Sequence, residues 1–521
     1  MKNEQSNIAI VGSGFLGLTL ALRLSNAGHN VTIFESASEI GGLAGTWQIG
    51  DVIWDKHYHV TLLSDSYTRN IAKEIGLENE FEWVETKTGF YTDGKLVSMS
   101  NTLEFLKFPP LDLISKLRLG ATIFYASRVK DWKALEKISV EEWLTKLSGK
   151  KTFEKIWKPL LKAKLGEAYK ETSAAFIWAT IQRMYAARNS GLKKEMFGYV
   201  RGGYATVLKR FGDHLEAKKV DFRLNSRITQ IEKLADGKIA VSVADSDKSN
   251  SVGRIPTSKV KTAPTLKVSN NNIDGSSPTG TVESIESSVG FHPALLSSSP
   301  SATGNEFEDG DFEDQKTKTE NLFDQVILTC PSNIAANILQ QLDDAEKQKL
   351  ENIKYQGIVC ASVLTKKPLS EFYVTNITDE TPFTGIIEMS ALVDKKEFDG
   401  NALIYLPKYV APDDELFEKS DEEIEDIFLP ALEKMYPHFD SSDVIEFKIS
   451  RVRQVFPLPT LEYSENVPSV KTSLENVYVV NSAQITNGTL NVNETIQLAE
   501  KFLEKEFARE IRERHEMKTK E

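Results

Sequence analysis

Residues 8–35 carry a pattern that few folds can accommodate: an apolar run, three spaced glycines, a helix-like stretch and a second apolar run that ends in an acid. The first run is typical of a buried strand, and Gly12, Gly14 and Gly17 follow it. In a βαβ unit the first glycine permits a tight turn, the second lets backbone approach a pyrophosphate, and the third lets the helix pack close to the strand. N–H groups at the start of that helix would face the phosphates. The pattern predicts a dinucleotide-binding unit, and the alternative is a glycine-containing turn in an unrelated fold.

Glu35 and two further glycines narrow the choice of dinucleotide. Glu35 ends the second apolar run 18 positions after Gly17, where a ribose-binding acid is expected. A carboxylate suits an unphosphorylated 2′-hydroxyl and would repel a 2′-phosphate, which favours FAD or NAD over NADP. Gly41 and Gly42 follow six residues later and fit a second backbone approach to the pyrophosphate or flavin. They favour FAD over NAD, with a plain turn as the alternative.

Composition bounds the class of protein. A chain of 521 residues with 40% hydrophobic residues is long enough for two or more domains. A net charge of −12 argues against a general nucleic-acid binder. Cys330 and Cys360 form neither a metal motif nor a disulfide framework, so a reducing compartment and core positions are expected for them. The N-terminus does not resemble a signal peptide, and no run of about 18 apolar residues occurs. These features predict a cytoplasmic protein.

The order of predicted elements indicates an α/β fold, in which a Rossmann-like FAD-binding domain is interrupted by an α+β substrate domain with a mostly helical subdomain. Amphipathic helices are predicted at 64–75, 111–129 and 140–147, followed later by helices at about 421–435 and from about 493. Predicted strands lie at 221–225, 227–232, 239–243, 323–331, 358–364, 384–389, 402–406 and 476–480. Residues rich in Ser, Thr, Asn and Gly between 245 and 320 are typical of a disordered insertion. The predicted division is 1–63, 196–244, 321–352 and 470–521 for the FAD-binding domain, 64–195 for the helical subdomain, 245–320 for the insertion and 353–469 for the rest of the substrate domain.

The helical region contains a strongly basic stretch. Residues 103–170 hold 15 Lys and Arg against 8 Asp and Glu, so they carry +7 while the rest of the chain carries −19. Apolar and aromatic residues are interleaved: Phe105, Phe108, Leu111, Phe124, Tyr125, Trp132, Trp143 and Trp157. One hypothesis is a surface that rests on the inner face of an anionic membrane and admits a lipophilic substrate. The interpretation that we favour from the sequence is a helical subdomain with a basic solvent face and an aromatic core.

His57 and His59 are the clearest candidates for polar chemistry. Two positions apart, they would share a side on a strand or diverge in a loop. With Asp55 nearby they could orient a substrate or relay a proton, whereas the alternative is a pair of structural histidines. Two histidines and an aspartate could also bind a metal, but no other ligand cluster supports this, and we predict no metal site.

Several segments, taken together, resemble a known superfamily. They are the Gly12–Glu35 fingerprint, Glu39-Ile-Gly-Gly-Leu-Ala-Gly-Thr46, Trp54-Asp-Lys-His-Tyr-His59, Tyr199-Val-Arg-Gly-Gly203 and Val479-Val-Asn-Ser-Ala-Gln484. In these the chain resembles the FAD-dependent monoamine oxidases, protoporphyrinogen oxidases, phytoene desaturases and UDP-galactopyranose mutases, and bacterial protoporphyrinogen-oxidase-like proteins most of all. The similarity covers most of the chain except 245–320.

The resemblance implies FAD as the cofactor and assigns residues to it. The ADP half is expected on Gly12, Gly14, Gly17, Glu35, Gly41 and Gly42, with Ser13, Phe15, Leu16, Leu43, Ala44 and Ile228 as neighbouring contacts. Asn481, Asn491 and Val492 are expected where the final strand, loop and helix meet the isoalloxazine, and the helix N-terminus would stabilise negative charge there. Asn493 is read either as part of this edge or as the N-cap of the helix. Arg201, Gly202 and Gly203 are candidates for substrate binding.

Two positions depart from the superfamily pattern. Asn481-Ser482 stands where relatives usually show Gly-Asp, although a neutral amide can still donate to a phosphate. Leu43 stands where many amine oxidases carry Arg, which counts against amine-oxidase activity more than against the fold.

Three functions remain open from the sequence. The leading hypothesis is an FAD-dependent oxidoreductase that removes hydride from an apolar or cyclic small molecule. The second is a flavin-dependent sugar-nucleotide mutase, for which Arg183, Arg188 and Arg201 are available to a diphosphate. The third is a non-catalytic FAD-stabilised binding protein that uses the insertion for partners.

Overall fold

The computed structural model describes residues 5–188, 196–244 and 321–507. All of them belong to one compact unit. The predicted insertion at 245–320 lies outside the described residues. Within the described part, no helix is both long and apolar enough to span a bilayer.

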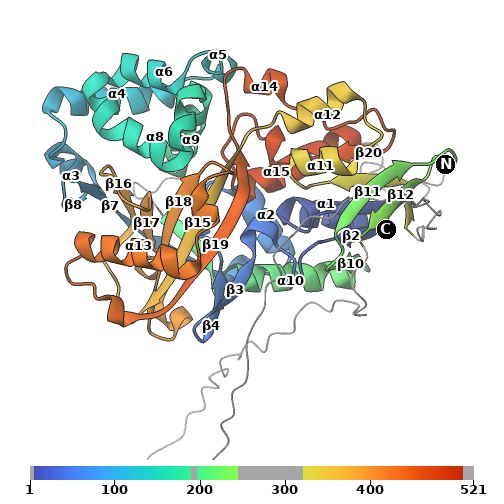
Figure 1. Ribbon diagram of the computed structural model, residues 1–521, viewed down its shortest axis with the longest axis horizontal. Helices are drawn as coiled ribbons and strands as arrows, with labels where there is room; N and C mark the ends of the chain where they lie inside the picture. Colours follow the sequence, from blue (N-terminus) through green and yellow to red (C-terminus); the bar gives the residue numbers. More distant parts are fainter. Residues whose placement is uncertain (1–4, 189–195, 245–320, 508–521) are drawn as a thin grey trace, which may run out of the picture. The chain divides into compact units, whose positions relative to one another are not determined.

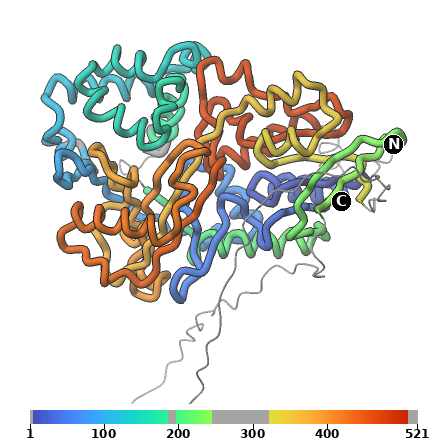
Figure 2. The backbone as a smooth tube through the Cα atoms, viewed as in Figure 1, coloured from blue at the N-terminus to red at the C-terminus, as the bar shows by residue number. Residues whose placement is uncertain are grey.

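A five-stranded parallel sheet is assembled from distant parts of the chain (Figures 1 and 2). Its order is β10 (Asp221–Arg223), β2 (Asn30–Phe34), β1 (Asn7–Val11), β14 (Gln325–Leu328) and β20 (Val477–Val479). β1 lies in the middle, with Ile8 opposite Val31 on one side and opposite Gln325 on the other. Parallel strands are covered on both faces, which explains the nearly continuous apolar runs in the sequence.

Alternate residues of β1 enter two different cores. Ile8 and Ile10 pack with α1 (Phe15–Asn26), α2 (Ser66–Glu74), α10 (Gly203–Ala217) and α15 (Val492–Glu506). Ala9 and Val11 pack with α11 (Ser332–Ile338) and with the small sheet β11 (Ile228–Lys233), β12 (Ile239–Val243) and β13 (Leu322–Phe323). α12 (Asp344–Glu351) follows α11. The predicted strand at 323–331 is in fact two strands, because β13 pairs with β12 in the small sheet, whereas β14 pairs with β1 and β20 in the parallel sheet.

A seven-stranded mixed sheet forms the second part of the unit (Figure 1). Its order is β19 (Val444–Pro457), β15 (Tyr355–Thr365), β18 (Ala402–Val410), β17 (Gly385–Glu388), β16 (Phe372–Ile377), β7 (Lys87–Thr92) and β8 (Lys95–Ser98). Every residue of β15 is buried: Val359 and Val363 face a core with α13 (Asp421–Met435), and Ile358 and Leu364 face the helical layer. The sheet therefore separates two cores. α14 (Tyr463–Asn466) follows β19.

The helical layer runs from α3 to α9. Its members are α3 (Thr102–Lys107), α4 (Leu113–Ala126), α5 (Trp132–Leu135), α6 (Val140–Ser148), α7 (Lys150–Thr152), α8 (Lys158–Leu165) and α9 (Ala174–Arg188). The prediction of a mainly helical stretch is confirmed for this part. It was wrong for 81–98, which forms β6 (Phe81–Glu85), β7 and β8, because pairing with distant strands outweighs the weak local pattern.

Short strands complete the unit. β3 (Thr46–Ile49) and β4 (Val52–Asp55) form a hairpin after the Gly41–Gly42 segment. β9 (Met196–Val200) pairs with β6 and with β5 (Thr61–Leu62). β4 ends next to the start of α10, and the Tyr405 hydroxyl on β18 donates to the Asp55 carbonyl, so the loop that carries His57 and His59 begins beside the seven-stranded sheet.

Candidate functional site

The first glycine loop brings the start of α1 against the end of β1. Gly12 has a φ of +106°, which L side chains rarely adopt, and its amide donates to the Phe34 carbonyl at 2.8 Å. A Cβ added to Gly17 would lie 2.0 Å from the Gly12 carbonyl oxygen. Because that neighbour is backbone, only glycine allows this close approach of helix and strand.

The second glycine segment lies directly beside the first. The Gly41 amide donates to the Ser13 carbonyl at 3.0 Å, and a Cβ added to Gly42 would lie 3.3 Å from Gly14 Cα. Nothing lies within 4 Å of a Cβ added to Gly14 itself. No side chain caps the N-terminus of α1. The two segments therefore form a backbone-lined cradle next to a helix N-terminus, which fits a pyrophosphate.

Glu35 is held at the edge of this cradle. One carboxylate oxygen accepts from the Ser13 amide at 2.8 Å and from the Ser13 hydroxyl at 2.7 Å. The other accepts from the Ala37 amide at 2.9 Å. Ser13 is fully buried, so its part is to position the Glu35 carboxylate beside the glycines.

The other residues predicted to contact the ADP half of FAD differ in how far their side chains are exposed. Phe15, Leu16, Ala44 and Ile228 are buried, and their side chains pack in the two cores on either side of the five-stranded sheet. Leu43 is 37% exposed. A cofactor in the cradle would therefore meet the backbone of the four buried residues rather than their side chains.

The C-terminal end of the parallel sheet approaches the same region. Asn481 is buried: its Oδ1 accepts from the Ala483 amide at 2.9 Å, and its Nδ2 donates to the Cys330 carbonyl at 2.9 Å. Asn481 stands where the superfamily pattern has Gly, and its side chain ties the end of β20 to the loop after β14. Asn491 is the N-cap of α15 through the Glu494 amide, and Val492 is the first helical residue.

Asn493 is not the N-cap of α15. Its Oδ1 accepts from the amides of Tyr67 at 2.9 Å and Thr68 at 3.3 Å, which are in the first turn of α2. The reading of Asn493 as the cap of its own helix was wrong, because the N-cap is Asn491, two residues earlier, and Asn493 lies within the first turn of α15. Asn493 instead satisfies donors that α2 cannot satisfy itself.

The two predicted histidines diverge in the loop after β4. His57 Nε2 lies 3.1 Å from the Ser450 hydroxyl on β19. Burial, reinforced by neighbouring positive charge, lowers the pKa of His57 to about 3. This imidazole is neutral near pH 7 and suits hydrogen bonding better than proton transfer.

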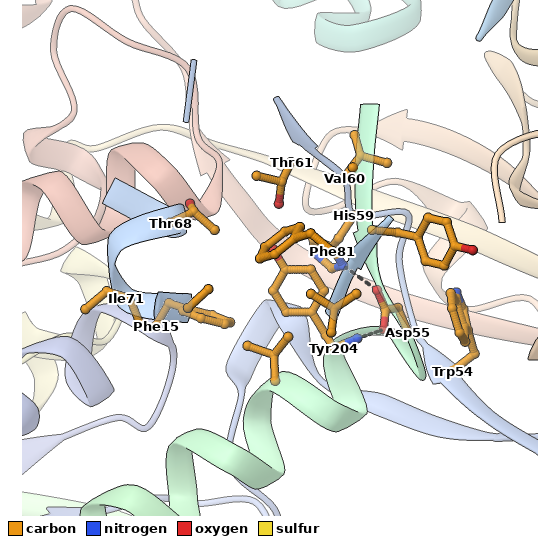
Figure 3. A pocket seen from close by; sticks show the side chains of 16 residues that line it. Phe15, Trp54, Asp55, His59, Val60, Thr61, Thr68, Ile71, Phe81 and Tyr204 are labelled. Atoms are coloured by element: carbon orange, nitrogen blue, oxygen red, sulfur yellow. Dashed lines mark hydrogen bonds and ion pairs between the residues drawn. The ribbon is translucent and has the colours of Figure 1, made fainter. Parts of the chain in front are cut away.

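His59 faces the other side, toward Asp55 and Tyr204 (Figure 3). Its Nδ1 lies 3.4 Å from the Asp55 carboxylate, a distance and direction that make the contact electrostatic rather than a well-formed hydrogen bond. Asp55 is 2% exposed and accepts from the Tyr204 amide at 2.8 Å, and burial raises its pKa. A cavity of about 20 Å³, room for about one water molecule, lies beside these residues and Phe15.

The sequence did not reveal a lysine and tyrosine cluster on the other side of this loop. Lys164 of α8 donates to the Tyr409 hydroxyl at 2.5 Å, and its Nζ lies 3.9 Å from the centre of the Tyr409 ring. The Tyr409 and Tyr58 hydroxyls are 2.8 Å apart. Burial lowers the pKa of Lys164, and within the described residues no carboxylate pairs with it. In the sequence, only the position of Tyr58 between the two histidines pointed toward this cluster.

The predicted substrate residues at 201–203 lie at the start of α10. Arg201 is exposed and forms an ion pair with Glu82 at 2.9 Å. The Gly202 amide donates to Glu397, and a Cβ on Gly203 would lie 2.9 Å from the Asp55 carboxylate. The glycines let α10 pack against β4, whereas Arg201 points away from Asp55 and toward the surface carboxylate.

A family comparison agrees with this geometry. The model of the flavin-containing amine oxidoreductases matches residues 17–260 and 305–493. The chain belongs to this family of flavoproteins, and its cofactor is FAD, for which the paired glycine segments and Glu35 are suited.

The curated relatives are similar to only part of this chain. A zeta-carotene desaturase from Synechocystis is 26% identical over 261 residues, covering 45% of this chain and 52% of the relative. Protoporphyrinogen oxidase 2 from Arabidopsis thaliana is 27% identical over 139 residues, covering 25% of this chain and 27% of the relative. The chain thus aligns with about half or less of the length of the curated relatives it matches.

Solved structures show the same fold over nearly the whole chain. An oxidoreductase from Methanosarcina mazei superimposes with a TM-score of 0.65 at 15% identity, covering 96% of this chain and all of that one. At this identity the similarity concerns the fold alone.

Proposed function

We propose that this protein is an FAD-dependent oxidoreductase that removes hydride from an apolar or cyclic small molecule. The observation that carries the proposal is the contact between the two glycine segments beside Glu35. Gly12, Gly14, Gly41 and Gly42 would bind the pyrophosphate through backbone, and Glu35 the ribose. Asn491 and Val492, at the start of α15, would lie at the flavin ring.

The bound flavin supplies a hydride acceptor, so the protein has to bind the substrate, orient it and exclude water from around it. Tyr58, Tyr405 and Tyr409 belong to the core that fills the space between the seven-stranded sheet and the helical layer. In the proposal, aromatic side chains of this core would contact an apolar or cyclic substrate. We assign His57 and Lys164 to holding the hydroxyl groups of Ser450 and Tyr409, and His59 with Asp55 to positioning the loop.

The mutase hypothesis requires cations that converge on a diphosphate. Arg183 is paired with the buried Asp65 at 3.0 Å, and Arg201 is paired with Glu82 on the surface. The side chain of Arg188 lies outside the described residues. The two described arginines thus already have carboxylate partners, which favours the oxidoreductase over the mutase.

The proposed substrate is lipophilic, and contact with an anionic membrane surface is part of the proposal. Support comes from α3 and α4, where large apolar side chains are exposed among basic residues. The prediction of a basic solvent face and an aromatic core holds for Trp143 and Trp157, which are buried. It fails for α4, whose Phe124 and Tyr125 are exposed.

The visible spectrum of the purified protein tests the proposal. Flavin bands are expected, and anaerobic mixing with a lipophilic cyclic substrate should bleach them. Turnover of a UDP-sugar only after reduction with dithionite would favour the mutase instead. A protein that retains flavin but reacts with neither class would favour the binding protein, and absence of flavin after reconstitution would refute the central claim.

A further inference from the structure

Large apolar side chains at the surface are concentrated on α3 and α4. Among the described residues, the seven most exposed large hydrophobic side chains all fall between 103 and 125. We call them the α3–α4 surface: Leu103 (70% exposed), Leu106 (46%), Leu113 (63%), Ile114 (72%), Leu117 (63%), Phe124 (56%) and Tyr125 (52%). Elsewhere no such side chain in the described part exceeds 44%. Single exposed apolar residues are normal, but a cluster of this kind marks an interaction site.

α4 is inverted relative to an ordinary surface helix. Its buried face includes Ser115, Lys116 and Thr122, together with Leu119 and Ala126. Positions 113, 117, 120 and 124 follow the spacing of one helix face and point outward. A helix that exposes leucines and buries a lysine is costly unless something apolar covers the outer face.

The buried polar groups of α4 are satisfied, so this orientation is well determined locally. Lys116 Nζ donates to the Leu106 carbonyl at 2.7 Å and so ties α4 to the end of α3. The Thr122 hydroxyl donates to the Arg118 carbonyl at 2.8 Å. Arg118 reaches the Leu147 carbonyl at the end of α6. These bonds hold the apolar face outward.

The charge around this surface indicates what covers it. Lys107, Arg118, Arg128 and Lys130 are exposed at its rim, and the Arg128 guanidinium lies 4.9 Å from the centre of the Phe124 ring. The stretch 103–170 carries +7 in a chain of net charge −12. Apolar and aromatic side chains ringed by cations are typical of a helix that lies in the headgroup region of an anionic bilayer.

We propose that the α3–α4 surface docks on an anionic lipid bilayer, with Leu113, Ile114, Leu117 and Phe124 entering the headgroup region and the basic rim contacting lipid phosphates. This contact is peripheral. It assigns residues to the membrane contact of the proposed function, on which it rests, and because it involves neither the glycine cradle nor the Lys164 cluster, it can be tested independently of the flavin chemistry.

The test is co-sedimentation of the full-length, FAD-loaded protein with vesicles. Phosphatidylcholine vesicles containing about 30% phosphatidylglycerol are compared with pure phosphatidylcholine, at low and at high salt. The wild type is expected to sediment with the anionic vesicles and to be released in part by salt. The double variant Ile114→Gln/Leu117→Gln should lose about tenfold or more in vesicle affinity, because two largely exposed apolar anchors are removed.

A matched control is available on the same unit. Ile427→Gln/Ile445→Gln changes two exposed isoleucines on α13 and β19 and should leave vesicle binding unchanged. The flavin spectrum of each variant, recorded on the same sample, shows that the fold and the cofactor site are intact. Absence of binding to anionic vesicles by the flavin-loaded wild type would overturn the proposal. So would a wild-type dimer that the Ile114/Leu117 variant converts to a monomer without vesicle binding, since a second copy would then be the occupant.

Discussion

Replacing Gly14 by Ala separates the cofactor role of the glycine loop from its structural role. Gly14 has φ −68° and ψ 175°, which alanine adopts without strain, and its added Cβ would have nothing within 4 Å. The folded protein should therefore tolerate the change, with about 0.5 kcal/mol lost at most as the residue before α1. The same Cβ would stand where backbone has to approach the pyrophosphate. Overpacking of about 1–3 kcal/mol predicts a loss of FAD affinity of about 5- to 150-fold.

Gly17 provides the opposite case. Its added Cβ would lie 2.0 Å from the Gly12 carbonyl oxygen, more than about 1 Å inside a normal carbon–oxygen contact. Gly17→Ala must therefore move α1 away from β1 and should cost about 1–3 kcal/mol or more of folding stability.

The assay compares both variants with the wild type in two measurements. FAD affinity is measured from the fluorescence of released flavin, and stability from the melting temperature without added FAD. Gly14→Ala should change the first and spare the second, and Gly17→Ala should lower both. Wild-type FAD affinity in Gly14→Ala would refute the placement of the pyrophosphate, and equal destabilisation by both variants would make Gly14 a structural residue.

Three further outcomes follow from the same geometry. Glu35→Ala should weaken FAD binding about tenfold or more by removing charged hydrogen bonds. Glu39→Ala, at a neighbouring exposed position, should leave FAD binding unchanged. Equal FAD retention by the two variants would contradict the assignment of Glu35 to the ribose. Lys164→Met should raise the melting temperature at pH 7, because it removes an ammonium group that burial disfavours. A lower melting temperature would show that the ammonium stabilises the fold. Burial raises the pKa of Glu388 to about 7, so the folded state holds a proton that the unfolded state releases above about pH 4.5, and wild-type stability should fall between roughly pH 4.5 and 7. Glu388→Gln should flatten this pH dependence: between pH 5 and pH 8 the free energy of unfolding of the variant, measured in urea, should rise by about 3 kcal/mol relative to that of the wild type. Parallel pH profiles for the two proteins would contradict the buried, protonated Glu388.

Local sequence signals predicted the elements that depend on local chemistry. α13 was predicted at its observed bounds, since Ser420 and Glu423 form a capping box in front of an amphipathic stretch. β12 was also predicted at its bounds, and β1 and β2 followed from apolar runs beside diagnostic glycines. β16 and the 14-residue β19 were missed. β16 has little alternation of apolar and polar residues and pairs with the distant β7 as well as with β17. β19 does alternate from Ile445 to Ser450, so this local signal was overlooked.

The residues of the candidate site also fall into two groups, those that local sequence predicts and those that it does not. The glycines and Glu35 are recognisable because each spacing has a fixed backbone consequence within one βαβ unit. Lys164 and Tyr409 are separated by 245 positions, and in the sequence Lys164 is one of 15 basic residues in a helical stretch. Nothing local distinguishes it from the lysines that remain in solvent.

By itself, the sequence determined the cofactor class and the unit that binds it, because a strand, three glycines and an acid act through local backbone geometry. Only the tertiary structure decided that His57 and His59 diverge, that Asn493 serves α2, and that Lys164 meets two tyrosines. It also decided which face of α4 points outward. The periodicity of α4 permits either face to be buried, and the choice rests on bonds such as that from Lys116 to α3, which exist only once the helices have packed.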